Sequence, residues 1–356
     1  MTIESKEDTI TNISKYYCVN SNTLNKHYKT KISGFTSWTQ KNHAEEYLIF
    51  PENIGPFLSI DEVALSKGEL YTFVTNKAGC GKKGTIVAVI AGTKSEDIQK
   101  VLEKIDLPLR ESVMEITLDM AKNIEAGVKY SFPSATLVTD RFHVVKLALE
   151  SLQHVRVKLR WSEMDLENAR LAKIKKVSKD FETRIKSNED NPKKRKQLEN
   201  KLQKVISKNQ TQIFENGDTP KQLLARSRYI LAKKEDTWTL SQKERATLLF
   251  TQYPMLKTAY HEVLAFRNIY EEQNKDKAQT KLENWIKSVH EKEMKDFYTV
   301  ANTVENNFEN ILNFFNNRNT NANAESFNSK IKLFRSNQRG VRDTKFFLFR
   351  LAKLFA

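Results

Sequence analysis

The chain has 356 residues, of which 39% are hydrophobic, and its formal net charge is +15. The apolar content, which includes 20 phenylalanines, excludes a disordered chain, and two widely separated cysteines, Cys18 and Cys80, argue against a disulfide framework and a structural zinc site. No apolar run approaches the roughly 18 residues that a membrane span needs, so the sequence predicts a soluble, intracellular protein without a membrane partner.

Positive charge is concentrated in one part of the chain. Residues 151–210 contain 17 basic and 8 acidic residues, a surplus of 9 within one sixth of the sequence. A field of this sign attracts polyanions, and nucleic acid is the commonest partner. The alternative interpretation is a solvated helix with surplus lysine.

Residues 1–50 are predicted to form a small helical segment. Two short helices over 8–34 are joined by a turn at Cys18–Ser21, and the second helix directs Asn25, Lys26 and Lys29 outward. This is the layout of a helix-turn-helix, whose second helix enters the major groove of DNA. A plain helical hairpin has the same pattern, and both interpretations stay open. Residues 35–56 are interpreted as a connection.

From Phe57 the pattern changes to strands. Runs at 57–65, 70–76 and 85–91 predict a three-stranded meander, and the spacing of apolar residues predicts a core-facing helix ending near Pro108. The alternating run at 113–119 predicts a strand that lies parallel to an earlier one through a right-handed crossover. A helix at 121–130 and a strand at 135–139 follow. The order βββ-α-β-α-β predicts a mixed α/β, RNase H-like sheet.

Beyond Asp140 the spacing of apolar residues is helical to about residue 315, with breaks at Asn188–Pro192, Asn216–Pro220 and near Pro254. We interpret residues 51–150 as the first part of the sheet domain, 151–310 as a basic all-helical insertion, and 311–356 as helices that complete the sheet domain. The basic residues proposed to contact DNA phosphates in these later parts are Lys193, Lys194, Arg195, Lys196, Arg335 and Arg339.

Three acidic residues on different elements are candidates for one metal site. Asp61 lies in the first strand, Asp119 ends the crossover strand, and Glu325 lies in a late helix. Magnesium prefers hard oxygen ligands, and two such ions stabilise the attacking and leaving oxygens of a phosphoryl displacement. Each acid also has a plain structural alternative: an edge-strand carboxylate for Asp61, a helix N-cap for Asp119 and a surface residue for Glu325.

Two further groups of polar residues accompany these acids. In the late helix, Glu325 shares one stripe with Asn321, Asn328 and Lys332, while Phe327 and its apolar neighbours form another. A second dense cluster is Asp140-Arg141-Phe142-His143. Its alternative interpretation is a capping aspartate followed by a partly buried histidine, and two ligands alone would make a thin metal site.

The segments IDEVALSKGELY, ITLDMAKNIEAGVKYSFPSATLVTDRFHVVKLALE, RYIL, YPMLKTAY and NAESFNSKIKLF resemble the ISL-three insertion-sequence family of bacterial DDE transposases. The resemblance runs from about Phe57 to the C-terminus, and the strings DRFHV and AESFNSKIK are its most specific parts. It implies an RNase H-like catalytic domain interrupted by a helical insertion, and magnesium-dependent cleavage and strand transfer at the ends of a mobile element.

Carried onto this sequence, the resemblance places the acidic triad at Asp61, Asp119 and Glu325, holding two Mg²⁺ ions with Mn²⁺ as a substitute. Asp140 competes for the second position. We prefer Asp119, because Asp140 and His143, with Arg141, resemble a separate supporting motif that several transposase groups carry just downstream. Asn321, Asn328 and Lys332 are assigned the same supporting role.

The implied partners are double-stranded DNA at the element ends and target DNA, bound by a homo-oligomer in a bacterial cytoplasm at the nucleoid. The family pattern also includes an N-terminal zinc-binding segment that this chain does not offer. Either a separate DNA-binding polypeptide supplies it, or this copy is truncated. The alternative functions are an RNase H-like endonuclease without strand transfer and a DNA-binding protein derived from a transposase that no longer cuts.

Overall fold

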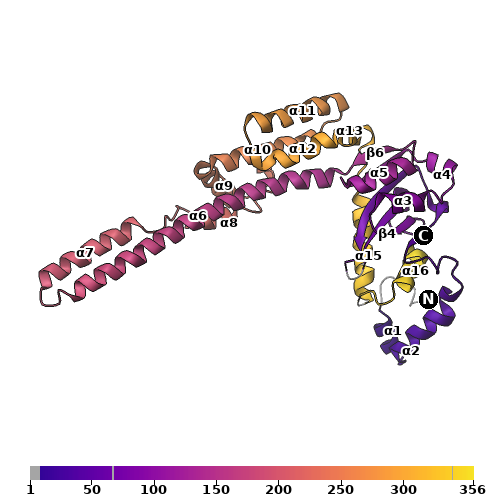
Figure 1. Cartoon of the computed structure of the whole chain (residues 1–356), viewed down its shortest axis with the longest axis horizontal. Coiled ribbons are helices and arrows are strands. Elements are labelled where there is room, and N and C mark those ends of the chain that lie inside the picture. The colour runs from indigo at the N-terminus through magenta and orange to yellow at the C-terminus, as the bar shows by residue number, and fades with distance from the viewer. Residues whose placement is uncertain (1–8, 66–67, 339) are drawn as a thin grey trace. The chain divides into compact units, whose positions relative to one another are not determined.

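The computed structural model describes residues 9–65, 68–338 and 340–356 (Figure 1). The chain divides into two compact units. The first comprises Met1–Val144, Glu272–Gln279 and Val304–Ala356, and the second comprises Val145–Glu271 and Thr280–Thr303. Arg339, one of the predicted DNA contacts, lies outside the described residues.

The first unit contains a six-stranded mixed sheet in the order β1-β4-β3-β2-β5-β6. The pairs β1/β4, β4/β3 and β3/β2 are antiparallel, whereas β2/β5 and β5/β6 are parallel. The predicted meander and the crossover to a parallel strand are therefore confirmed. The strands are β1 (Tyr47–Ile49), β2 (Phe57–Ala64), β3 (Leu70–Asn76), β4 (Ile86–Ala91), β5 (Glu115–Leu118) and β6 (Thr136–Thr139).

Strand β1 lies within the stretch that the sequence analysis interpreted as a connection. It pairs with β4, Leu48 opposite Val89, and Leu48 is almost fully buried. A run of three residues is too short to show strand periodicity in the sequence. Its pairing with β4 depends on residues about 40 positions away, so local spacing could not reveal it.

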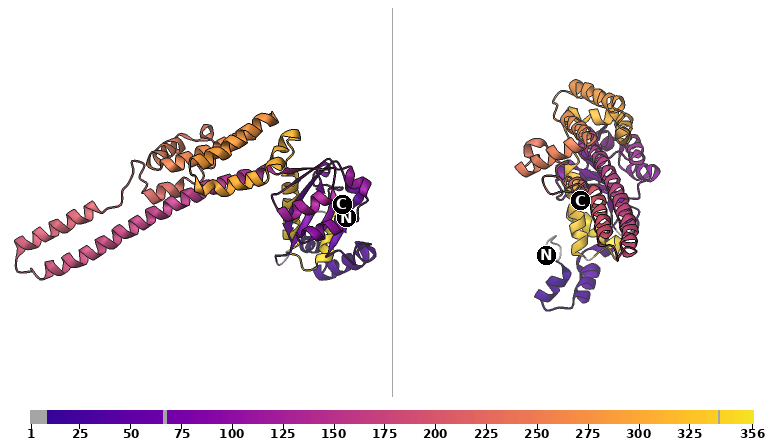
Figure 2. Two further views of the ribbon diagram at one scale, coloured as in Figure 1. Left: turned by 45° about the horizontal axis from the view of Figure 1, so that its top comes forward. Right: turned by 90° about the vertical axis from the view of Figure 1, so that its left-hand side faces the viewer.

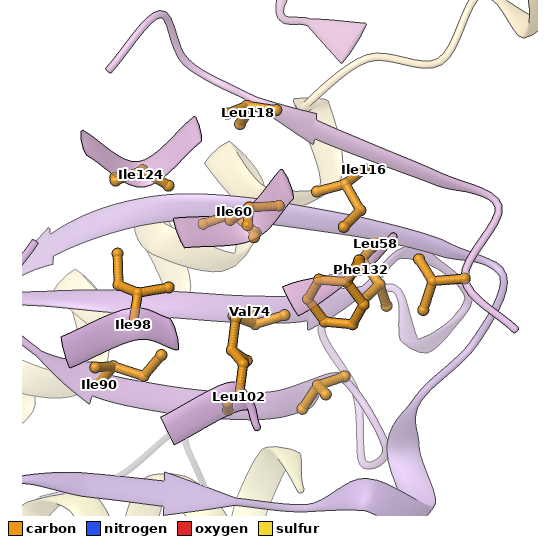
Figure 3. Close-up of a cluster of buried hydrophobic side chains, with 14 of the residues drawn as sticks. Leu58, Ile60, Val74, Ile90, Ile98, Leu102, Ile116, Leu118, Ile124 and Phe132 are labelled. Atoms are coloured by element: carbon orange, nitrogen blue, oxygen red, sulfur yellow. The ribbon is translucent and has the colours of Figure 1, made fainter. Parts of the chain in front are cut away.

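One face of the sheet packs against the helices α3 (Ser95–Leu102) and α5 (Lys122–Ser131), with the short α4 (Leu107–Glu111) between them in the chain. Figure 3 shows Ile98 and Leu102 of α3 lying over Ile60, Val74 and Ile90 of the strands. These side chains and Ile105 are buried, as the helical spacing predicted. Strand residues Leu58 and Ile60 belong to this face, which leaves Ser59 and Asp61 on the other.

The opposite face packs against α15 (Ala322–Asn337) and α16 (Thr344–Phe355). The predicted apolar stripe of the late helix is confirmed, since Phe327, Ile331 and Phe334 are buried with Val63 and Phe73 of the sheet. This stripe holds α15 across β2, and the polar stripe of the same helix then lies beside Asp61.

The N-terminal segment forms two helices and a π-helical turn, α1 (Ile10–Tyr16), α2 (Ser21–His27) and η2 (Tyr28–Ile32). They pack on α16, because the buried rings of Tyr28 and Phe35 contact Phe346 and Phe349. Short 3-10 turns occupy Phe35–Ser37, Pro51–Asn53, Lys77–Gly79, Glu235–Thr237 and Lys295–Phe297.

The second unit is helical. Prolines begin three of its helices, at the breaks predicted from the sequence, because proline suits the first turn of a helix. Helix α7 runs beside the end of α6 in both Figure 1 and Figure 2. The helices from α6 onward are α6 (Arg141–Lys186), α7 (Pro192–Lys208), α8 (Pro220–Arg226), α9 (Leu240–Gln252), α10 (Pro254–Ile269), α11 (Lys275–Glu291), α12 (Tyr298–Asn306), α13 (Phe308–Leu312) and α14 (Phe314–Asn317), the last two in the first unit.

Among the described residues, no helix has both the length and the apolar character that a membrane span requires. The whole of the mixed sheet and its covering helices belongs to the first unit, so the candidate site can be described there without reference to the second.

Candidate functional site

Three aspartates lie level with one another on three adjacent parallel strands: Asp61 within β2, Asp119 directly after β5 and Asp140 directly after β6. The register pairs Ser59 with Thr117 across β2 and β5, and Leu118 with Thr139 across β5 and β6. Continued along the strands, it brings Asp61, Asp119 and Asp140 abreast. We call these three residues the acid row. The parallel register of β2, β5 and β6 therefore gathers these side chains.

Asp61 is held on both sides of its carboxylate. Oδ1 accepts a hydrogen bond from the backbone N–H of Glu62 at 2.8 Å, and Oδ2 accepts one from Nδ2 of Asn328 at 2.6 Å. Burial raises the pKa of Asp61, the bond from Glu62 and the nearby His143 lower it, and the carboxylates of Asp119 and Asp140 raise it. The charged form of Asp61 is therefore costly until a cation meets it.

Asp119 does not cap the helix that follows it, because the N-cap of α5 is Ala121. Its Oδ1 accepts a hydrogen bond from the N–H of Met120 at 2.6 Å, and its Oδ2 lies 3.7 Å from Nε2 of His143. The side chain is 42% exposed, which leaves it accessible to a ligand. The interpretation of Asp119 as a simple N-cap is thus excluded.

Asp140 and His143 form a close pair at the start of α6. Nδ1 of the imidazole lies 3.0 Å from Oδ2 of Asp140, while Oδ1 of Asp140 accepts a hydrogen bond from the backbone N–H of Asn321 at 3.2 Å. The bond to Asp140 raises the pKa of His143, although burial opposes it. One imidazole thereby lies between Asp140 on one side and Asp119 on the other.

Glu325 reaches the acid row from the first turn of α15. One ligand atom each of Asp140, His143 and Glu325 lies within 4.8 Å of the others. Partial burial raises the pKa of Glu325, with Asp140 and Asp61 adding to the effect and His143 opposing it. Residues from β2, from the ends of β5 and β6, and from a helix more than 180 positions later in the chain therefore share one electrostatic environment.

A series of asparagine amides attaches this late segment to the sheet and its helices. Residues 302–328 contain eleven asparagines. Their hydrogen-bond partners could not be predicted from the sequence, because each partner lies far away in the chain. The side-chain amides donate hydrogen bonds as follows: Asn310 to Glu125, Asn313 to the carbonyl of Leu137, Asn317 to Glu115, Asn323 to the carbonyl of Lys77, and Asn328 to Asp61.

These donors are neutral, and that matters for the chemistry of the site. An amide orients a carboxylate without cancelling its charge, whereas a lysine or arginine would compete with a metal ion. The acid row and Glu325 supply hard carboxylate oxygens, the ligand type that Mg²⁺ and Mn²⁺ prefer. The raised pKa values of Asp61 and Glu325 indicate carboxylates short of positive charge. The residues present therefore fit a divalent cation.

One buried polar residue of the sheet was missed by the sequence analysis. Glu115 of β5 is only 2% exposed, and all four residues of the strand are buried. Its carboxylate lies 3.6 Å from Nζ of Lys77 and accepts a hydrogen bond from Asn317 at 3.0 Å. A lysine after one strand and a glutamate in another gave no local signal of this pairing.

The remaining predicted residues have varied surroundings. Lys332 is exposed on α15, and Arg141 lies over the ring of Phe314 at 5.8 Å. Arg335 donates to the carbonyls of Ala64 and Leu65 at 2.9 Å, so it fastens the end of β2.

The predicted DNA contacts also differ in their exposure. Asn25 and Lys26 are exposed on α2, whereas Lys29 forms an ion pair with Asp343. Within the run 193–196 of α7 every side chain is exposed, and Arg195 pairs with Glu199 at 3.0 Å.

A mixed sheet of this order, carrying carboxylates on three adjacent parallel strands and interrupted by a helical unit, is an RNase H-like fold. Residues 58–351 match the family model of transposases of the DDE, ISL-three (ISL3) type, so the chain belongs to this transposase family. Comparisons with curated proteins and with solved structures gave no match.

Proposed function

We propose that this transposase cleaves DNA strands and joins the resulting 3′ ends to target DNA with a triad of Asp61, Asp119 and Glu325. The observation that carries the proposal is the convergence of the acid row, from three adjacent parallel strands, with Glu325 of α15. Carboxylates this close together need positive charge nearby. Divalent cations would neutralise them and would also bind the phosphates of a polynucleotide.

The triad would hold two Mg²⁺ ions, with Mn²⁺ as a substitute. Two such ions stabilise the attacking and the leaving oxygen of an in-line phosphoryl displacement. The protein supplies the oxygens and their orientation. Asp61 is fixed by Asn328 and by the N–H of Glu62, and Asp119 by the N–H of Met120, so little reorganisation is needed when a substrate arrives.

Asp140 and His143 act as a positioning pair. Asp140 accepts from the N–H of Asn321, which holds the first turn of α15 and therefore Glu325 against the acid row. His143, bound through Nδ1 to Asp140, directs Nε2 toward Asp119. A protonated imidazole there would moderate the repulsion between the carboxylates before the cations bind.

DNA would be held by basic residues that do not belong to the acid row. The exposed side chains of Lys193, Lys194 and Lys196 on α7 would contact phosphates without reading sequence. On the N-terminal segment, Asn25 and Lys26 are the exposed candidates for a groove contact by α2, because Lys29 is occupied by Asp343. These roles follow from charge and exposure.

The direct test uses duplexes that carry the element's own end. With Mg²⁺ or Mn²⁺ the wild-type protein should cut the strand, and with a pre-cleaved end bearing a free 3′-hydroxyl it should form joined products. The Glu325→Gln variant should do neither. Equal activity of the two proteins would remove Glu325 from the triad, and cutting without joining would indicate an endonuclease.

A further inference from the structure

A cavity of about 400 Å³ lies close to the acid row, within the first unit. It is formed by the end of β3, the start of β2 and the segment that leads into α15. Among the described residues that line it there is no carboxylate. The polar lining supplies two cations, three amides and one hydroxyl, from Lys77, Arg318, Asn76, Asn319, Asn323 and Thr320.

Lys77 forms an ion pair with Glu115, a buried residue that does not line the cavity. Its side chain is 10% exposed, lies 3.6 Å from Glu115 and donates to the hydroxyl of Thr117. Burial lowers the pKa of Lys77, while Glu115 and Asp140 oppose that change. Lys77 thus lines the cavity while its ammonium lies against Glu115 and Thr117.

Arg318 is held in a backbone conformation that favours glycine. Its φ is +55°, in the left-handed region, which costs a residue with a side chain of the order of 1 kcal/mol or more. The guanidinium donates to the carbonyl of Glu272 and lies 5.3 Å from the ring centre of Phe314. Arg318 follows the end of α14 and contributes to the lining of the cavity.

The cavity adjoins the acid row through strand β5. Thr117, the hydroxyl partner of Lys77, precedes Asp119 by two residues, so both side chains lie on the same face of the strand. Two residues of a strand span about 7 Å. Asn323, which donates to the carbonyl of Lys77 at 3.3 Å, likewise precedes Glu325 by two residues on α15.

We infer that this cavity is a phosphate-binding subsite that receives a backbone phosphate beside the one undergoing reaction. Donors on several sides and a cationic guanidinium suit the oxygens of a phosphate, and the absence of a lining carboxylate removes the main source of repulsion. The inference rests on the proposed function, because the phosphate belongs to the strand lying across the acid row.

The test measures DNA binding by the full chain in EDTA, where no cleavage occurs. Fluorescence anisotropy follows a labelled duplex of the element's own end, with single uncharged methylphosphonates placed in turn at the six linkages around the cleavage point. The exposed residue Asn323 is changed to Asp, an isosteric replacement that adds a negative charge to the lining, and to Ala, which removes the donor alone. Asn302→Asp, exposed on α12 in the second unit, is the matched control for net charge.

For wild type and Asn302→Asp, one methylphosphonate beside the cleavage point should weaken binding about tenfold, the factor expected for one charge-assisted hydrogen bond. Asn323→Asp should bind the unmodified duplex about tenfold more weakly and lose sensitivity to that same linkage, since the two changes remove one interaction. Asn323→Ala should show a smaller loss. Circular dichroism should show the same fold for all variants.

The inference is overturned if Asn323→Asp binds the unmodified duplex as tightly as Asn302→Asp. It is also overturned if a methylphosphonate at each of the six linkages weakens binding by the same factor in both variants. Inorganic phosphate, added at constant ionic strength, separates the sources of the anion. If it binds wild type but not Asn323→Asp, while no methylphosphonate has a position-specific effect, the subsite takes a free anion and the assignment to DNA is wrong. Metal-dependent cleavage tests the triad independently, so the two failures are distinguishable.

Discussion

Asn328 of α15 donates a 2.6 Å hydrogen bond to Asp61 of β2, a residue 267 positions earlier in the chain. This bond joins the helix that carries Glu325 to the strand that carries the first acid of the triad. Asn328 is itself nearly buried, so water cannot easily replace the donor. The contact makes Asn328 a positioning residue for Asp61.

Replacing Asn328 with leucine should therefore reduce cleavage about 10–100-fold, the loss usually seen when a group that orients a metal ligand is removed. The apparent affinity for Mn²⁺ should fall with it, because Asp61 loses its fixed orientation. The measurement is cleavage rate against Mn²⁺ concentration. Ser326→Ala, an exposed position on the same helix, is the control and should change little. An unchanged Mn²⁺ dependence in Asn328→Leu would show that the bond has no positioning role.

Asp119 and Asp140 should respond differently to the same substitution. Asp119→Asn should abolish cleavage, by at least about a hundredfold, with little change in stability, because its side chain is 42% exposed. Asp140→Asn should lower the melting temperature as well, since Asp140 is buried and bonds both His143 and the N–H of Asn321. Rates and thermal unfolding of both variants separate the roles. A dead Asp140→Asn with wild-type stability would instead make Asp140 the second acid.

Much of this arrangement follows from local sequence patterns. Alternating apolar residues place the strands, and the parallel crossover then gathers Asp61 and Asp119 at one edge of the sheet. The helical stripe of Phe327 and Ile331 fixes which side of α15 is buried, and Glu325 follows from it. These features depend on periodicity, which is visible within ten or fifteen residues.

The unpredicted features depend on partners far apart in the chain. Glu115 was not singled out, although all four residues of β5 are buried. Its partners Lys77 and Asn317 belong to other elements. The asparagines of 302–328 were unpredictable for the same reason. A side-chain amide can donate to any carboxylate or carbonyl, so the sequence does not reveal its partner.

The acid row should destabilise the protein when no metal is bound. Because the pKa of Asp61 is raised above its ordinary value of 3.8, its protonated form favours the folded state, and that contribution is lost as the pH rises through the folded pKa. Asp61→Asn, which keeps an acceptor for Asn328, should therefore melt higher than wild type at pH 7 in EDTA. A stability change of 1 kcal/mol would shift the melting temperature by about 2–4 °C.

This advantage should narrow as the pH falls through the raised pKa of Asp61, because the folded wild type then takes up a proton and loses the buried charge. Adding Mg²⁺ should raise the melting temperature of wild type more than that of Asp61→Asn, since ligand binding stabilises the state that holds it. Calorimetric scans between pH 5 and 8 would check both statements. A variant that melts below wild type throughout this range would contradict them.

The basic run on α7 should dominate the salt dependence of DNA binding. Changing Lys193, Lys194 and Lys196 to glutamine should reduce the slope of log affinity against log salt by about 0.9 for each phosphate contact that is lost. The control removes the same charge from Lys94, Lys100 and Lys129, exposed residues of the first unit on or beside α3 and α5. Equal slopes for the two triple variants would show that the run 193–196 makes no special contact.

The central claim is that Asp61, Asp119 and Glu325 together hold divalent cations. Anomalous diffraction from crystals grown with Mn²⁺ tests it most directly. We expect strong peaks about 2.2 Å from carboxylate oxygens of all three residues, and loss of at least one peak in Glu325→Gln. Manganese bound elsewhere while the three carboxylates remain without metal, in a protein that still cleaves DNA, would contradict it.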